Sequence, residues 1–176
     1  EDHSHVCRLE SVGQSVQGRE LWALCISDNP ASDEAEPEFR YISTMHGDEP
    51  LGTEMTLRFI DLLISSYGGA DVQADRITEL VNQTEIWVLP CMNPDGLEAG
   101  TRYNANGYDL NRGFPDGVAT DLGTAFAEPN MDVSGRQPET AAVMQWSRQH
   151  AFTLAANFHT GALLVCYPFG NNPQHD

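Results

Sequence analysis

The sequence contains no lysine, because all nine of its basic residues are arginine. A lysine Schiff base and the lysine of a phosphate-binding P-loop are therefore excluded. Aspartate and glutamate together number 26, which gives a formal net charge of −17 at pH 7. A chain this acidic lacks the basic surface that nucleic-acid binding requires, so we expect no nucleic-acid partner. Any catalysis must depend on histidine, carboxylates, arginine or a metal ion.

Cysteine is scarce, and long apolar runs are missing. The four cysteines are too few for a disulfide scaffold, and none belongs to a C-x-x-C pair. We interpret Cys91 and Cys166 as buried thiols, while the disulfide state of all four, including Cys7 and Cys25, stays open. No apolar run is long enough to cross a membrane, so we expect no membrane segment. A hydrophobic content of 40% over 176 residues suits one globular domain with a sizeable core.

Strand-like and helix-like stretches alternate along the chain. An acidic, proline-containing stretch over 28–38 is predicted to be a solvated loop between two adjacent strands, 21–26 and 39–45. The other predicted elements are a helix over 51–67, a helix over about 71–81, a buried strand over 85–90, a loop over 93–129, a helix over 138–150, and strands over 152–158 and 162–167. This order predicts an α/β fold with a mixed, mostly parallel sheet flanked by helices. Ligands bind such sheets where strands end and loops begin.

One histidine and one glutamate stand at the first of these strand ends. Among six histidines, only His46 is followed three residues later by a glutamate, Glu49. An isolated H-x-x-E pair is weak support for a metal site, because on a helix it is often a solvated ion pair. Here the pair lies between a predicted strand and a predicted helix. A turn at that place can direct a histidine nitrogen and a carboxylate oxygen at one point, as zinc requires.

His159 is the candidate for a third ligand, because it ends a later predicted strand and the small residue Gly161 follows closely. Without His46 and Glu49, an ordinary surface or core histidine would be the better interpretation. Two histidines and one glutamate form the open zinc site of peptidases, in which the metal lowers the pKa of water towards about 7 and polarises a carbonyl. The remaining histidines lie near the chain ends or on a helix and are interpreted as incidental: His3, His5, His150 and His175.

The segments between these residues carry a family pattern. The chain resembles the zinc metallocarboxypeptidases, and within them the regulatory branch that includes carboxypeptidases D, E, M and N. The resemblance covers almost the whole chain and follows the family's order of motifs. These motifs are VGQS (12–15) with GRELW (18–22), MHGDEPLG (45–52), LPCMNPDG (89–96), YDLNRGFPD (108–116), QPET (137–140) and NFHTGALLVCYPF (157–169).

The resemblance implies a role for each matching residue in the metal centre. His46, Glu49 and His159 correspond to the ligands of one Zn²⁺ ion. Arg102 corresponds to the arginine that polarises the scissile carbonyl and stabilises the oxyanion. Asp109 corresponds to the carboxylate that orients the imidazole of the first ligand.

The resemblance also implies a substrate-binding pair. Asn111 and Arg112 correspond to the residues that bind the free C-terminal carboxylate of the substrate, a task for which the planar guanidinium is suited. An alternative for Arg102 and Arg112 is solvation or pairing with some of the 26 acidic residues. An alternative for Asp109 and Asn111 is turn formation.

Two departures from the family pattern affect specificity and completeness. Relatives of this branch carry an aspartate just after the YPF motif, facing a basic C-terminal side chain, whereas this chain has Gly170. A preference for C-terminal lysine or arginine is thereby in doubt. The family's general-base glutamate and substrate-capping tyrosine lie far beyond the third ligand, but no glutamate follows Glu139. We therefore interpret residues 1–176 as one catalytic domain that is incomplete at both ends, with the remainder of that domain as its partner.

The expected function is a zinc-dependent carboxypeptidase acting on the C-termini of peptides or proteins. One alternative is an amidohydrolase of the same fold that acts on acylated amino acids or cell-wall peptides. Another is a non-catalytic peptide-binding member of the family, against which the intact ligands and arginines speak. The resemblance favours an extracellular or periplasmic location, while the natural substrate and the oligomeric state stay open.

Overall fold

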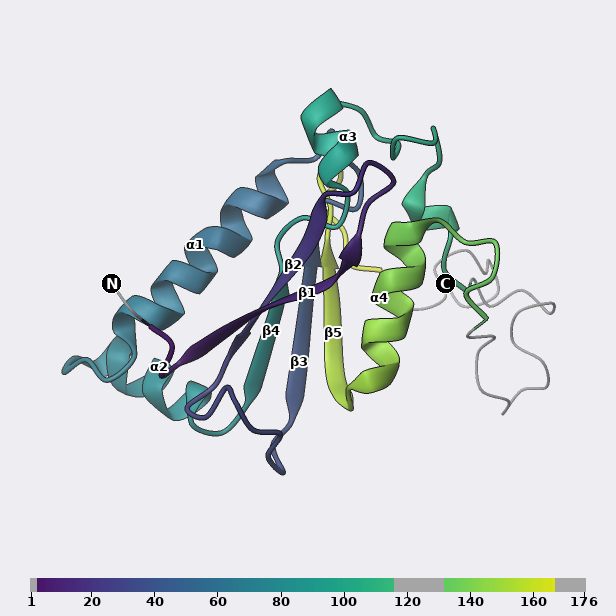
Figure 1. Ribbon diagram of the computed structural model, residues 1–176. Helices are drawn as coiled ribbons and strands as arrows, with labels where there is room; N and C mark the ends of the chain where they lie inside the picture. Colours follow the sequence, from purple (N-terminus) through teal and green to yellow (C-terminus); the bar gives the residue numbers. More distant parts are fainter. Residues whose placement is uncertain (1–2, 116–131, 167–176) are drawn as a thin grey trace.

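The computed structural model describes residues 3–115 and 132–166, and its centre is a five-stranded sheet (Figure 1). The strand order is β1-β2-β4-β3-β5, with β3 parallel to both β4 and β5. The β1–β2 and β2–β4 pairs are antiparallel. The strands are β1 (Cys7–Gln14), β2 (Glu20–Ile26), β3 (Glu38–Ser43), β4 (Glu85–Leu89) and β5 (Phe152–Phe158). The predicted α/β class with a mixed sheet is confirmed.

Helices cover both faces of this sheet. In Figure 1, α1 and α2 lie on one side of the strands and α4 lies on the other. None of the described helices is long and apolar enough to cross a membrane. The helices are α1 (Leu51–Ser66), α2 (Val72–Val81), α3 (Pro94–Ala99) and α4 (Pro138–Gln149), with a short 3₁₀ helix η1 (Leu110–Arg112).

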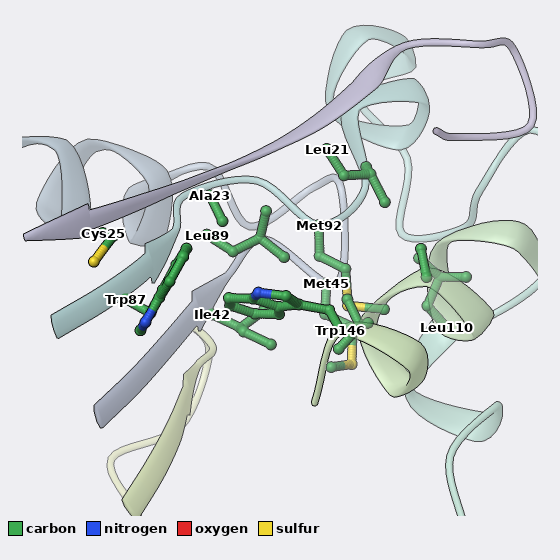
Figure 2. Close-up of a cluster of buried hydrophobic side chains, with 12 residues drawn as sticks. Leu21, Ala23, Cys25, Ile42, Met45, Trp87, Leu89, Met92, Leu110 and Trp146 are labelled. Atoms are coloured by element: carbon green, nitrogen blue, oxygen red, sulfur yellow. The ribbon is translucent and has the colours of Figure 1, made fainter. Parts of the chain in front are cut away.

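The buried strand β4 explains why the core has two halves. Its side chains alternate in direction, as in any strand. Trp87 and Leu89 belong to the cluster that includes α4, whereas Ile86 and Val88 belong to the cluster under α1 and α2. In the first cluster, shown in Figure 2, the rings of Trp87 and Trp146 meet edge to face with centroids 5.8 Å apart. Because both of its faces are covered, β4 is an uninterrupted apolar run.

The predicted adjacency of the strands over 21–26 and 39–45 is wrong, because β4 lies between β2 and β3. A strand buried on both faces needs a neighbour on each edge, and an interior position supplies both. The predicted solvated loop between them also ends early. Glu38 begins β3 and is 7% exposed, with Oε1 accepting the N–H of Ala151 at 2.8 Å.

Three further differences arise where local pattern is weak. The strand β1 was not predicted, because none of its side chains is buried and its position depends on pairing with β2. The predicted loop over 93–129 contains α3 and η1, while its part beyond residue 115 lies outside the described residues. Residues 162–166 were predicted as a strand and are exposed without strand structure, since no described strand lies beside them to form a ladder; Tyr167 lies outside the described residues.

The cysteines differ from expectation at one position. Cys166 is exposed rather than buried. Cys91 is half-buried, and burial raises the pKa of its thiol to about 11. No disulfide joins any of the four cysteines, all of which lie among the described residues.

Candidate metal centre

The turn that follows β3 places His46 and Glu49. The backbone N–H of Glu49 donates to the carbonyl of His46 at 3.2 Å, which closes a tight turn before α1 begins. Thr44 just before it has φ of 49°, an unusual conformation for a β-branched residue. Gly47 packs directly on α3, where a Cβ would lie 2.0 Å from the backbone of Gly96. This close approach requires glycine at position 47 and fixes the turn against the next element.

His159 reaches the same place because β5 runs parallel to β3. Ser43, the last residue of β3, is in register with Phe158, the last residue of β5. The carboxyl ends of adjacent parallel strands lie at one edge of a sheet, so the residues that follow them meet there. His46 lies three residues beyond the end of β3, and His159 lies immediately beyond β5.

The three predicted ligands converge. His46 Nδ1 lies 2.9 Å from Glu49 Oε1 and 3.2 Å from His159 Nδ1. His159 Nδ1 lies 3.0 Å from Glu49 Oε2, which also accepts the backbone N–H of Thr160 at 3.0 Å. Four-coordinate zinc with bonds of about 2.0–2.1 Å holds its ligand atoms roughly 3.3–3.4 Å apart. The observed separations are close to that spacing, so the geometry fits one zinc ion.

The chemistry of the donors supports the same conclusion. His46 Nε2 lies 3.1 Å from Asp109 Oδ1, and a carboxylate only accepts, so the neutral tautomer that satisfies Asp109 carries its proton on Nε2. In the neutral imidazole Nδ1 is then a lone pair, and it faces the oxygen of Glu49. The lone pair of His46 Nδ1 and the carboxylate oxygen of Glu49 repel each other, with His159 Nδ1 beside them, unless a cation lies among the three atoms.

Both carboxylates beside this centre are held in their charged form. Burial acts to raise the pKa of Glu49, but the Thr160 N–H and the neighbouring His46 and His159 leave it below the ordinary value. Burial also acts to raise the pKa of Asp109, and hydrogen bonds from Arg102 and the Asn111 N–H again leave it lowered. A charged Glu49 is the form that binds a metal ion.

Arg102 lies at the edge of the centre and is anchored by Asp109. Its Nε and Nη2 donate to Asp109 Oδ2 at 3.0 and 2.8 Å. Its Nη1 lies 3.3 Å from His46 Nδ1 and 4.0 Å from Glu49 Oε1, and the side chain is 35% exposed. The predicted carbonyl-polarising arginine therefore borders the three ligands and reaches solvent.

Asn111 and Arg112 lie on η1, close to the centre in sequence but separate from the ligand atoms. The Asn111 N–H donates to Asp109 Oδ1 at 3.0 Å, and Arg112 Nη1 donates to the Asn111 carbonyl at 3.0 Å. Both side chains are exposed. Arg112 forms no ion pair with any carboxylate of the described residues, and with Tyr108 and Arg136 it lines a cavity of about 290 Å³.

Two buried or half-buried residues were missed or undervalued from the sequence. Asn93 is fully buried, and its Nδ2 donates to the carbonyls of Met45 and Arg102, next to two site residues. Its position before Pro94 suggests only a helix cap, a role it also fills. The sequence pattern also gives His150 no role; its Nδ1 lies 2.6 Å from Glu38 Oε2, away from the metal centre, where the pair joins the end of α4 to the start of β3.

A mixed α/β sheet with two histidines and one glutamate gathered at the ends of parallel strands defines a zinc hydrolase type of site. The family described as zinc carboxypeptidase matches residues 1–176, and the chain belongs to this family.

Its relatives are carboxypeptidases of the regulatory branch. Mouse (Mus musculus) carboxypeptidase M is 42% identical over 184 residues, covering 99% of this chain and 38% of the relative. The catalytic chain of rat (Rattus norvegicus) carboxypeptidase N is 38% identical, covering 97% of this chain and 41% of the relative. Carboxypeptidase D of Anas platyrhynchos is 43% identical, covering 98% of this chain and 12% of the relative. The chain thus spans less than half the length of these relatives.

Solved carboxypeptidases share the fold. Carboxypeptidase A from Helicoverpa armigera superposes with a TM-score of 0.69 at 22% identity, over 90% of this chain and 42% of that one. A metallo-carboxypeptidase from Pseudomonas aeruginosa, solved in complex with (2-guanidinoethylmercapto)succinic acid, gives a TM-score of 0.63 at 27% identity, over 90% of this chain and 37% of that one.

Proposed function

We propose that the protein containing this chain is a zinc carboxypeptidase that removes the C-terminal residue of peptides or proteins. The observation that carries the proposal is the convergence of His46, Glu49 and His159, with Arg102 beside them. When bound by these three residues, zinc would lower the pKa of water towards about 7 and polarise a carbonyl.

The other residues of the centre hold and orient His46 and Arg102. Asp109 accepts the Nε2–H of His46, which keeps Nδ1 free to face the metal site. Asp109 also anchors Arg102 through two nitrogens, so the third, Nη1, has a fixed direction towards the ligands. A guanidinium held in place before the reaction stabilises the negative charge that develops on the scissile carbonyl oxygen, at no cost of reorientation.

Arg112 and Asn111 are proposed to bind the terminal carboxylate of the substrate. Arg112 is exposed and is not paired with a described carboxylate, so its guanidinium is available for two parallel hydrogen bonds. Asn111 on the same 3₁₀ helix adds an amide beside it. The cavity of about 290 Å³ next to Arg112 offers space for the end of a peptide.

We propose that the general base comes from a part of the protein that this chain does not contain. In the described residues the two carboxylates at the centre already have roles, Glu49 as ligand and Asp109 as the partner of His46. The relatives are more than twice as long as the matched region. The outer surface of β5 supports the same idea, because Leu154 and Phe158 are 62% and 43% exposed and would be covered by further structure.

The test is the release of C-terminal residues by the protein that contains this chain, followed by mass spectrometry. We expect one zinc ion per molecule, loss of cleavage with a chelator and recovery with zinc. Matched peptides with amidated C-termini should resist. Equal cleavage of both peptide sets refutes the carboxylate-binding pair, faster hydrolysis of N-acyl amino acids identifies an amidohydrolase, and binding without turnover identifies a non-catalytic member.

A further inference from the structure

A buried polar pair connects α4 to the loop that carries Arg102 and Asp109. Glu139, in the first turn of α4, is 0% exposed, and Asn104 in the loop is 3% exposed. Asn104 Nδ2 donates to Glu139 Oε2 at 3.1 Å, and the other carboxylate oxygen accepts the backbone N–H of Val16 at 3.1 Å. Among the described residues Glu139 has no cationic partner. A dry carboxylate is costly unless its oxygens are hydrogen-bonded, so the position of its two donors is strictly constrained.

Asn104 uses both ends of its amide. Its Oδ1 accepts the backbone N–H groups of Asn106 and Tyr108 at 3.1 and 3.0 Å. Its own backbone N–H donates to the Tyr108 carbonyl at 3.0 Å, which closes the loop. Because Oδ1 must face these N–H groups, Nδ2 must face Glu139 and the side chain of Gln137, which accepts at 2.9 Å. The amide orientation is therefore determined from both sides.

The loop held in this way carries the two groups that act on the metal centre. Arg102 lies two residues before Asn104, and Asp109 directly follows Tyr108. Arg102 Nη2 and Asp109 Oδ2 are 2.8 Å apart, and Asp109 Oδ1 is 3.1 Å from His46 Nε2. A shift of the loop therefore moves the orienting carboxylate and the arginine together.

We propose that Asn104 and Glu139 are positioning residues that set the place of Asp109 and Arg102 relative to His46. They do not touch the substrate; they act through the loop over 101–109. Zinc affinity depends on the pair through the Asp109–His46 hydrogen bond, and turnover depends on it through Arg102. The consequence for turnover rests on the proposed function, whereas the consequence for zinc affinity does not.

The proposal can be tested by reversing the hydrogen bond between Asn104 and Glu139, so that residue 139 donates and residue 104 accepts. In Glu139→Gln only one oxygen remains, so an NH₂ group must face either the Val16 N–H or Asn104 Nδ2. In Asn104→Asp a second carboxylate faces Glu139 across 3.1 Å in a dry site. The double variant Asn104→Asp/Glu139→Gln restores the bonds of the buried pair: the new amide donates to the new carboxylate and still accepts from Val16, and the net charge is unchanged. Gln137, which is half-buried, turns its amide to donate to the new carboxylate, and the bond it loses comes from Asn106 Nδ2, whose exposed side chain can bond to water instead.

The experiment measures zinc affinity by competition with a chelator, and hydrogen exchange of the segment 101–112 by mass spectrometry. Measurements are made at a temperature at which near-UV circular dichroism shows each variant to be folded. The matched control is Asp71→Ala, which removes the N-cap of α2, whose side chain accepts from Gln73 and Ala74, and has no contact with the loop. Hydrolysis of a C-terminal peptide bond is followed in parallel.

We expect each single variant to weaken zinc affinity about 10- to 100-fold, the range for loss of a residue that orients a metal ligand. Exchange over 101–112 should become faster, kcat should fall, and the double variant should recover most of all three. Asp71→Ala should lower the melting temperature without changing zinc affinity. If one single variant does not fold, the other is compared with the double variant.

Single variants that behave as Asp71→Ala does would overturn the inference, and so would a double variant no better than the worse single one. A wild-type protein that binds zinc but hydrolyses no C-terminal peptide bond would refute the proposed function. In that case zinc affinity and hydrogen exchange of the segment 101–112 still decide whether Asn104 and Glu139 are positioning residues.

Discussion

Asp109 is the residue whose replacement tests the metal centre most directly. Its Oδ1 accepts from His46 Nε2 at 3.1 Å and from the Asn111 N–H at 3.0 Å, while Oδ2 accepts twice from Arg102. Asp109→Asn keeps the shape but has one oxygen for these four donors. If that oxygen stays on the guanidinium, the NH₂ group faces His46. His46 must then accept at Nε2 and carry its proton on Nδ1, the nitrogen that faces the metal site.

The size of the effect follows from these contacts. Loss of a partner that orients a metal-binding histidine lowers metal affinity about 10- to 100-fold. At about 1.4 kcal/mol per tenfold change, this equals about 1.4 to 2.8 kcal/mol of binding free energy. A hydrogen bond to a charged group contributes about 1.5–3 kcal/mol, so the two estimates agree.

Isothermal titration or chelator competition at pH 7.5 with Asp109→Asn, wild type and Asp61→Asn measures this effect. Asp61 is exposed on α1, so the same chemical change there should leave zinc affinity unchanged. Equal affinity of Asp109→Asn and wild type would show that Asp109 does not select the tautomer of His46.

Four further outcomes are expected. Arg112→Lys should raise KM for free-C-terminus peptides at least about tenfold, because an ammonium cannot form two parallel hydrogen bonds; an unchanged KM would contradict the proposed carboxylate grip. Gly170, which lies outside the described residues, predicts no strong preference for basic C-terminal residues, and a panel of peptides ending in Arg, Lys, Leu and Phe would show such a preference if it exists. The isolated 176-residue chain should lack normal peptidase activity, because the two carboxylates that the described residues place at the centre already have roles and neither is free to give acid–base help worth about 10²- to 10⁴-fold; robust turnover at an intact mass of 19.4 kDa would disprove this. The pKa values of Glu49 and Asp109 are lowered in the fold, so the metal-free protein should lose their stabilising contribution as pH falls below about 4, the pKa of the unfolded chain, and urea midpoints of Glu49→Gln should depend less on pH than those of wild type.

Local sequence determines those elements of this protein that have a strong periodic pattern or a clear cap. The helix α1 follows from apolar residues at helical spacing, and β4 follows from a short apolar run. The candidate ligands His46 and Glu49 could be found because their spacing and the preceding strand are both local features. His159 required only that its strand be recognised.

Tertiary structure alone decided which of these segments meet. No local feature places β4 between β2 and β3, since strand order depends on which faces and edges find partners. The same holds for Asn104 and Glu139, which are 35 residues apart and look like an ordinary turn residue and an ordinary helix-start acid. Their pairing arises only when the first turn of α4 packs against the loop and buries both side chains. Short-range sterics and periodicity are contained in neighbouring residues, whereas buried hydrogen bonds between distant segments depend on the surfaces that the whole fold brings together.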